Sequence, residues 1–516
     1  MWRYAPDAPI TAPDTITAIT GALIPTVRGG YRGPYSYGEL WYEATTVQSG
    51  YNGSALCVND AGGARLFLAA NTAIYELTST GTRTDRSKGG GYTTGTFFTF
   101  AQLGNTTVAG NKTDALQSST TGAFADTAGS PPKARIVLSD ANQIVLLNYN
   151  DGTDTPDGWW CSDVGTTATW TPASGNEAKN GRLRDAGGAI TAGCNSPFGG
   201  VIAFKKNAMY VGTYVGQPYV RRWRKVSDRV GCGWIEGCVN TGEKVYFASS
   251  QDVYEFDGSQ IRSITEGIRK HLRENVLHAI YQRVVLQWDQ TNSLLYLWYG
   301  PTAAGGGGLL NGCYVYNTVT GNWGYASGYA AWGATLNGST DTTAVPVGFL
   351  SVTADEVKAV FTDLSPIADQ AVNASHWAFF SNNNAAIKVV SFGCFSGESL
   401  PSYADISPAA VTWTTSYQGD TRNMVTLQGI TPDVVTTDNA AVTYARFSIS
   451  VTGKQFTAYG PTCSSASATM SSKYKFDLLA QGHFLSATYS IDLTSATSNI
   501  PEWFGHTPEY VKAGRA

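Results

Sequence analysis

Val245-Tyr246-Phe247 and Val253-Tyr254-Glu255-Phe256 are two short apolar runs separated by a turn, and Asp257-Gly258 follows the second run. The same unit occurs earlier in the chain, where Leu66-Phe67-Leu68 precedes Ile74-Tyr75-Glu76-Leu77. The offset between the copies is constant, so Glu76 corresponds to Glu255 and Arg83 to Arg262. Runs of apolar, β-branched and aromatic residues bounded by turn residues predict β-hairpins.

Looser copies of this hairpin recur along the chain, at 136–138 with 144–147, 201–204 with 209–212, and 294–298 with 314–316. One hairpin cannot bury its own apolar face, so hairpins that return roughly every 50 residues are typical of stacked or radial β units. Propellers arrange such units as four-stranded blades around a channel. The sequence therefore predicts an all-β fold, with a β-propeller of five or six blades over residues 61–395.

The regions on either side of the repeats have a different character. Residues 1–60 are rich in Pro, Thr, Gly and Tyr, and they predict an irregular N-terminal arm with one or two strands. Residues 396–516 contain longer alternating runs and predict an additional C-terminal β region, which is either a sandwich or platform or a set of strands that closes the ring. One helix is expected at 266–280, where Ile268, Leu272 and Val276 share a face.

The composition suits a protein that makes contacts. Charged residues form 14% of the chain, against about 25% in typical soluble domains. Low charge with many aromatic residues is typical of surfaces that become interfaces. The net charge of −4 argues against tight nucleic-acid binding by the whole surface. No signal peptide or membrane-spanning run is visible, so we expect no membrane insertion, and we expect synthesis and assembly in a cytoplasm.

The sequence offers no convincing catalytic or metal site. The eight cysteines are scattered without a C-x-x-C pair, which predicts reduced core thiols. The five histidines lack the spacing of a zinc motif, and no G-x-S-x-G is present. We therefore predict no catalytic residue, no metal ligand and no cofactor.

Glycoside hydrolysis is the main enzymatic alternative, since propellers can host the two convergent carboxylates that it needs. The candidate carboxylates are Asp154, Asp157, Asp163, Asp252 and Glu255. The segment from Cys161 to Trp170 resembles the Asp-containing turn of sialidase propellers, although its spacing differs and that turn has a structural role.

Two basic clusters are the candidate interface or channel contacts. The first contains Arg221, Arg222, Arg224 and Lys225 on a predicted strand, and it suits a salt-bridged interface edge or, with Trp223, contact with nucleic acid. The second contains Arg269, Lys270 and Arg273 on the predicted helix, and it suits a solvated face or a docking face for an acidic partner.

The order of motifs in the centre of the chain carries a family resemblance. The motifs lie at 159–172, 176–178, 185–191, 199–210, 226–232 and 245–258, with a weaker echo at 505–515. Together they resemble the propeller of bacteriophage short-tail hub or nozzle proteins, a group that includes the packaged-DNA stabilisation proteins. The N-terminal arm and residues 330–480 carry no such resemblance.

The resemblance implies a structural virion protein in the phage tail, below the portal and adaptor rings. It implies a homo-oligomeric ring, sixfold in symmetry, with adaptor, portal and tail fibre or spike proteins as neighbours. Genomic DNA would pass through the channel without specific binding, which agrees with a slightly acidic wall, because each cationic contact to a phosphate adds attraction. A glycosidase acting on host surface polysaccharide and a tail-fibre or receptor-binding module are the alternatives.

Overall fold

The structure is a computed structural model of the 516-residue chain. It describes residues 2–9, 12, 15–20, 22–32, 38–43, 51–60, 63–70, 72–77, 83–275, 283–289, 293–300, 310–330, 333–335, 360–362, 376–380, 387–391, 410–435, 446–492 and 502–515. Within these residues the regular structure is almost entirely β, with one α-helix, α1 (Arg269–Asn275). The all-β prediction is confirmed.

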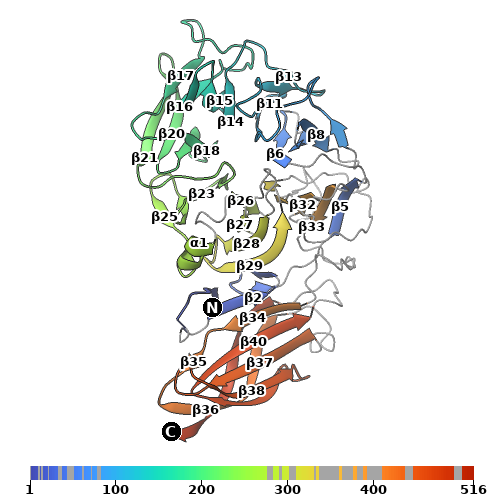
Figure 1. Ribbon diagram of the computed structural model, residues 1–516, viewed down its shortest axis with the longest axis vertical. Coiled ribbons are helices and arrows are strands. Elements are labelled where there is room, and N and C mark those ends of the chain that lie inside the picture. The colour runs from blue at the N-terminus through green and yellow to red at the C-terminus, as the bar shows by residue number, and fades with distance from the viewer. Residues whose placement is uncertain are drawn as a thin grey trace.

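Six four-stranded antiparallel arrays form the larger part of a ring (Figure 1). We call them blades 1 to 6 in chain order. Blade 1 consists of β6 (Tyr51–Val58), β7 (Ala64–Ala70), β8 (Ala73–Leu77) and β9 (Arg83–Asp85). Blade 2 consists of β10 (Thr99–Leu103), β11 (Thr106–Gly110), β12 (Gln117–Ser119) and β13 (Ala125–Asp126). Blade 3 consists of β14 (Lys133–Asp140), β15 (Gln143–Asn150), β16 (Asp154–Cys161) and β17 (Lys179–Arg182).

The other three blades repeat the pattern. Blade 4 consists of β18 (Ile190–Asn195), β19 (Val201–Lys205), β20 (Met209–Gly216) and β21 (Val220–Ser227). Blade 5 consists of β22 (Cys238–Asn240), β23 (Val245–Ala248), β24 (Val253–Phe256) and β25 (Ile261–Ser263). Blade 6 consists of β26 (Arg283–Asp289), β27 (Leu294–Gly300), β28 (Leu310–Asn317) and β29 (Trp323–Ala330).

A seventh unit completes the ring. It contains β30 (Gly333–Thr335), β31 (Val360–Thr362), β32 (His376–Phe380) and β33 (Ile387–Ser391), and β5 (Gly38–Glu43) from the N-terminal region pairs with β33. The first strands of the seven units, from β6 to β30, contact one another in a closed cycle within the described residues. The β-propeller is confirmed with six four-stranded blades, and the seventh unit adds a two-stranded and a three-stranded sheet to the ring. The hairpin repeat of the sequence does not reveal the seventh unit, because its strands come from two distant segments, one before blade 1 and one after blade 6.

The repeated hairpin of the sequence is confirmed in detail. In blade 1, Phe67 pairs with Glu76 across β7 and β8. In blade 5, Tyr246 pairs with Glu255 across β23 and β24, at the same offset. All residues of β19 and β23 are buried, because a middle strand of a blade is covered on both faces by the neighbouring blades.

A β-sandwich follows the propeller and includes strands from both ends of the chain (Figure 1). One sheet contains β1 (Arg3–Tyr4), β2 (Thr15–Thr20), β34 (Ala410–Thr415), β40 (Phe484–Asp492), β37 (Phe447–Lys454) and β38 (Thr462–Thr469), with β35 (Gln418–Gly419) beside β40. The other sheet continues blade 6 through β3 (Ala22–Pro25), β4 (Tyr31–Arg32), β41 (Glu502–Arg515), β36 (Asn423–Val435) and β39 (Phe476–Gly482). Residues 1–60 thus supply six strands, not one or two, because four of these strands, β2 to β5, pair with strands far away in sequence.

One apolar core runs from the sandwich into blades 5 and 6. Trp2, Trp413, Tyr489 and Trp503 form its aromatic centre, with ring centroids between 4.6 and 6.4 Å apart. The hydroxyl of Tyr31 lies within hydrogen-bond distance of two backbone carbonyl oxygens, that of Trp2 (3.1 Å) and that of Trp323 (2.9 Å). The continuous core and the continuous sheet join the propeller and the sandwich into one packed body.

The helix and the cysteines differ in part from what the sequence predicts. The described part of the helix is Arg269–Asn275, so the helix begins three residues later than the expected 266, because residues 266–268 form a turn. Ile268 and Leu272 are buried, and residues 276–280 of the expected helix lie outside the described residues. Cys463 is exposed on β38, not in the core, because alternate side chains of that strand face solvent; Cys394 lies outside the described residues. No helix in the part of the chain that the structure covers is long and apolar enough to span a bilayer.

Candidate functional site

Strand β21 carries the first basic cluster, and its two faces differ. Arg221 points toward blade 3, and its fully buried guanidinium donates to Asp140 of that blade at 2.7 Å. It also donates to the carbonyl of Gly212 on the neighbouring strand β20 at 3.1 Å. Lys225 lies 3.3 Å from Asp185. Since alternate residues of a strand share a face, Arg221 and Lys225 belong to the scaffold between blades 3 and 4.

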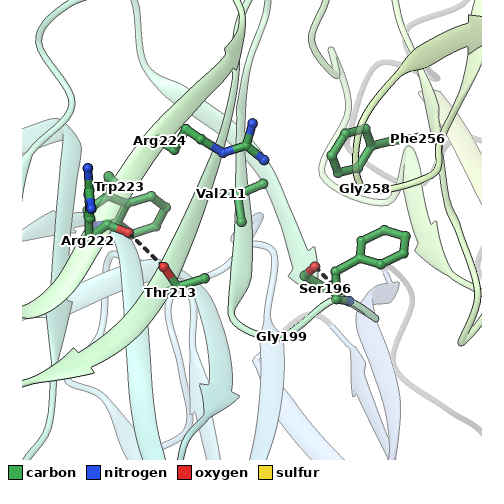
Figure 2. A pocket seen from close by; sticks show the side chains of 10 residues that line it. Ser196, Gly199, Val211, Thr213, Arg222, Trp223, Arg224, Phe256 and Gly258 are labelled. Carbon is green, nitrogen blue, oxygen red and sulfur yellow. Dashed lines mark hydrogen bonds between the residues drawn. The ribbon is translucent and has the colours of Figure 1, made fainter.

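Arg222 and Arg224 lie on the opposite face of β21, toward blade 5. Both are exposed, and within the described residues neither guanidinium forms an ion pair or hydrogen bond. They line a cleft of about 460 Å³ together with Trp223, Val211 and Thr213 on blade 4 and Phe256 and Gly258 on blade 5. Figure 2 shows the side chain of Arg224 extending toward the wall that carries Phe256. The remaining lining comes from the turn between β18 and β19, with Ser196, Phe198 and Gly199.

The wall opposite the arginines is aromatic and close-packed. Phe198 is 47% exposed and meets the buried ring of Phe256 edge to face, with centroids 5.8 Å apart. Gly258 has φ +94°, and a Cβ at this position would lie 3.1 Å from the Phe198 ring. The positive φ favours glycine here, and a side chain would also displace the Phe198 ring by a few tenths of an ångström, so the turn after β24 leaves room for that ring.

Exposed apolar side chains continue from the cleft to the tip of the β20–β21 hairpin. Tyr214 and Val215 are exposed there, and Tyr219 is 74% exposed. The hydroxyl of Tyr214 donates to the carboxylate of Glu177, and this hydrogen bond raises the pKa of Tyr214. The hairpin tip is thereby held against the loop of blade 3, so its apolar residues are presented on a fixed backbone.

The second basic cluster is mostly engaged within the chain. Arg269 lies 2.9 Å from Asp252 and donates to Ser263, while Arg273 donates to the carbonyl of Gln251 at 2.8 Å. Lys270 is exposed. Arg269 and Arg273 therefore hold α1 against blade 5, and the two basic clusters do not form one surface.

The five candidate carboxylates of the glycosidase alternative each have partners in the scaffold. Asp163 accepts from the backbone N–H groups of Val164 and Glu177, which is a turn-holding role. The other four form ion pairs: Asp154 with Lys112, Asp157 with Arg182, Asp252 with Arg269, and Glu255 with Lys244. Among the described residues no group of three or more His, Cys, Asp or Glu side chains is arranged to hold a metal ion.

Arg221 and Arg222 are adjacent in sequence but should respond oppositely to substitution. We expect Arg221→Met to lower the free energy of unfolding by about 2 kcal/mol, because Asp140 loses its buried hydrogen-bonded partner. The matched change Arg222→Met should stay within about 0.5 kcal/mol of the wild type, since its guanidinium is exposed. Urea unfolding of both variants measures the difference, and equal losses would contradict the assignment of the two faces.

Comparisons with known proteins show likeness of fold alone. No protein-family model matches the chain, and no curated protein matches it. A streptogramin B lyase structure is 10% identical and covers 68% of this chain and 97% of its own, with a TM-score of 0.38. A structure of YCF48 bound to D1 peptide is 9% identical, and the match covers 69% of this chain and 96% of YCF48, with a TM-score of 0.38. The extracellular domain of a putative one-component system from B. thetaiotaomicron is 9% identical. The match covers 75% of this chain and 46% of that domain's chain, with a TM-score of 0.41. Nothing about activity follows from such distant likeness.

Proposed function

We propose that this chain is a structural subunit of a short-tailed phage tail, a hub or nozzle protein that forms part of the DNA-exit channel below the portal and adaptor. One observation of the structure carries the proposal. The seven-unit ring and the β-sandwich share a continuous nine-stranded sheet and one apolar core. A subunit built in this way transmits load between its two parts without a hinge, which is what a conduit that must withstand packaged DNA requires.

The surface chemistry agrees with an assembly role. With 14% charged residues and a net charge of −4, the chain has little long-range attraction for a passing polyanion. In this proposal the subunits form a sixfold homo-oligomer through heterologous interfaces that close by rotation. The protein has no enzymatic role, and adaptor, portal and tail fibre or spike proteins are its neighbours in the virion.

Electron microscopy and native mass spectrometry of the purified full chain test this function. We expect closed rings, sixfold by the family resemblance, and in a virion the chain should lie on the tail axis below the portal. A duplex DNA fragment should show no retention by the chain at physiological salt. A chain that stays monomeric and is absent from virions would contradict the proposal, and threefold assembly would favour a receptor-binding module.

The enzymatic alternative has its own measurement. Incubation with host capsule or envelope polysaccharide should release no oligosaccharide above a blank without protein. Release that is lost in Asp154→Asn or Asp157→Asn but kept in Asp151→Asn, a change at an exposed carboxylate, would favour a glycosidase over a structural subunit.

A further inference from the structure

We propose that the cleft between blades 4 and 5 binds an acidic segment of a partner protein. We call it the Arg222/Arg224 cleft, formed by Phe198, Val211, Arg222, Arg224 and Phe256. The carboxylates of the segment contact the two guanidiniums, and an apolar side chain next to them packs on Phe198. This inference goes beyond the assembly proposed above, since it rests on the cleft and on no property of phage tails.

The charges of the cleft are the first support. The basic residues on the other face of β21, Arg221 and Lys225, are neutralised by Asp140 and Asp185. Arg222 and Arg224 have no such neighbour within the described residues. A guanidinium binds a carboxylate through two parallel hydrogen bonds, so two guanidiniums two residues apart along a strand suit carboxylates on an extended peptide.

The apolar surface beside the charges is the second support. Phe198 is exposed on the cleft wall, and Val215 and Tyr219 are exposed on the hairpin that leads away from it. Tyr214 lies on the opposite face of that hairpin, where its hydroxyl donates to Glu177 of blade 3. Tyr, Phe and Arg are enriched in protein interfaces, where rigid aromatic groups supply area at low entropic cost. A cleft of about 460 Å³ accommodates one or two side chains of a peptide, and the hairpin extends the contact along its backbone.

A protein segment fits this surface better than nucleic acid does. A nucleic acid carries regularly spaced phosphates and is held by a track of many cations. The cleft offers two, and the neighbouring basic residues of β21 are already paired. A short acidic segment needs no more than these two positive charges.

Selection from a display library of short random peptides on the immobilised full chain tests the proposal. Peptides enriched on the wild type should contain Asp or Glu next to an aromatic or aliphatic residue. On the double variant Arg222→Glu/Arg224→Glu this preference should disappear, and Lys or Arg should be enriched instead. The matched control is Lys206→Glu, which reverses an exposed charge on the same blade, in the turn between β19 and β20.

Binding measurements then give the size of the effect. The most enriched peptide is synthesised with a fluorescent label. It should bind Arg222→Glu/Arg224→Glu at least about tenfold more weakly than the wild type. Its affinity for Arg222→Gln/Arg224→Gln should also be at least about tenfold lower than for the wild type. Phe198→Ala should weaken binding several-fold, while Lys206→Glu should leave it unchanged. Thermal melts confirm that each variant is folded.

Three outcomes would overturn the inference. Peptides without acidic residues could be enriched on the wild type, or Lys206→Glu could weaken binding as much as the double variant does. A single-stranded oligonucleotide could bind more tightly than the peptide and lose that binding in the double variant, which would assign the cleft to nucleic acid. Peptide binding by a chain that forms no ring would contradict the proposed function and leave this inference intact.

Discussion

Trp503→Ala is expected to lower the free energy of unfolding by about 3–5 kcal/mol. Trp503 lies on β41 and is 1% exposed, and its ring is 4.6 Å from that of Tyr489 and 5.1 Å from that of Trp413. Its ring also lies 5.9 Å from the ring of Trp2, so it packs on residues from the early and the late parts of the sequence. Removing it opens a cavity where the two sheets of the sandwich meet. Denaturant unfolding followed by circular dichroism measures the loss.

Two further variants separate packing from other causes. The indole N–H of Trp503 has no hydrogen-bond partner among the described residues, so Trp503→Phe should cost much less than Trp503→Ala. Tyr510 lies on the same strand and is 58% exposed, so Tyr510→Ala should be close to neutral. A loss in Tyr510→Ala as large as that in Trp503→Ala would mean that the strand, not the aromatic centre, determines stability.

Glu76→Gln is the second change with a large expected effect, a loss of about 3 kcal/mol. The carboxylate of Glu76 is almost buried and accepts from Arg65 at 2.7 and 3.1 Å and from Arg86 at 2.5 Å. Arg65 also donates to Ser119 and to the carbonyl of Thr120 in blade 2, so the group joins two blades. The amide would leave two guanidiniums close together without a negative charge between them.

The effect of Glu76→Gln should depend on pH. Burial alone would raise the pKa of Glu76, but the hydrogen bonds and charges of Arg65 and Arg86 outweigh it, and the pKa lies below its usual value. The carboxylate therefore stabilises the fold fully above the unfolded pKa of about 4.3, and this contribution is lost as the pH falls through the lower folded pKa. The difference between wild type and variant should be largest near neutrality and shrink in acid.

The repeat supplies a matched control for this variant. Glu255 occupies the corresponding position of blade 5, and among the described residues its one cationic partner is Lys244, at 2.8 Å. Glu255→Gln should therefore cost about 1 kcal/mol, within the range of a partly exposed ion pair. Equal losses at the two positions, or a Glu76→Gln loss that is constant with pH, would contradict the role assigned to the two arginines.

The hairpin pattern was sufficient to predict the propeller because each blade folds from neighbouring residues. Phe67 and Glu76 pair across a short turn, as do Tyr246 and Glu255 at the same offset, so the local pattern of apolar and turn residues contains the structure. The seventh unit and the sandwich could not be predicted in this way. Their partners are far apart, as in the pairing of β5 with β33 and of β4 with β41, and no local pattern records such a pairing.

The sequence predicted only part of the candidate site, because the site also depends on contacts between distant segments. The basic run at 221–225 is visible in the sequence, and alternation along a strand indicates that its residues face two ways. Which face is paired depends on Asp140 and Asp185, which other segments bring to it. Phe198 and Phe256 were not singled out, because their meeting depends on how blades 4 and 5 pack.

The pairing of β2, β3, β4 and β5 with strands late in the chain has a consequence during translation. These strands leave the ribosome before their partners, because β2 pairs with β34, β4 with β41 and β5 with β33. Until those late partners are synthesised, the early strands have unpaired backbone groups and a bare Trp2, which is the state most open to aggregation. Nascent chains of this protein are therefore expected to depend on chaperones until the last strand emerges, and early translation termination should yield insoluble fragments.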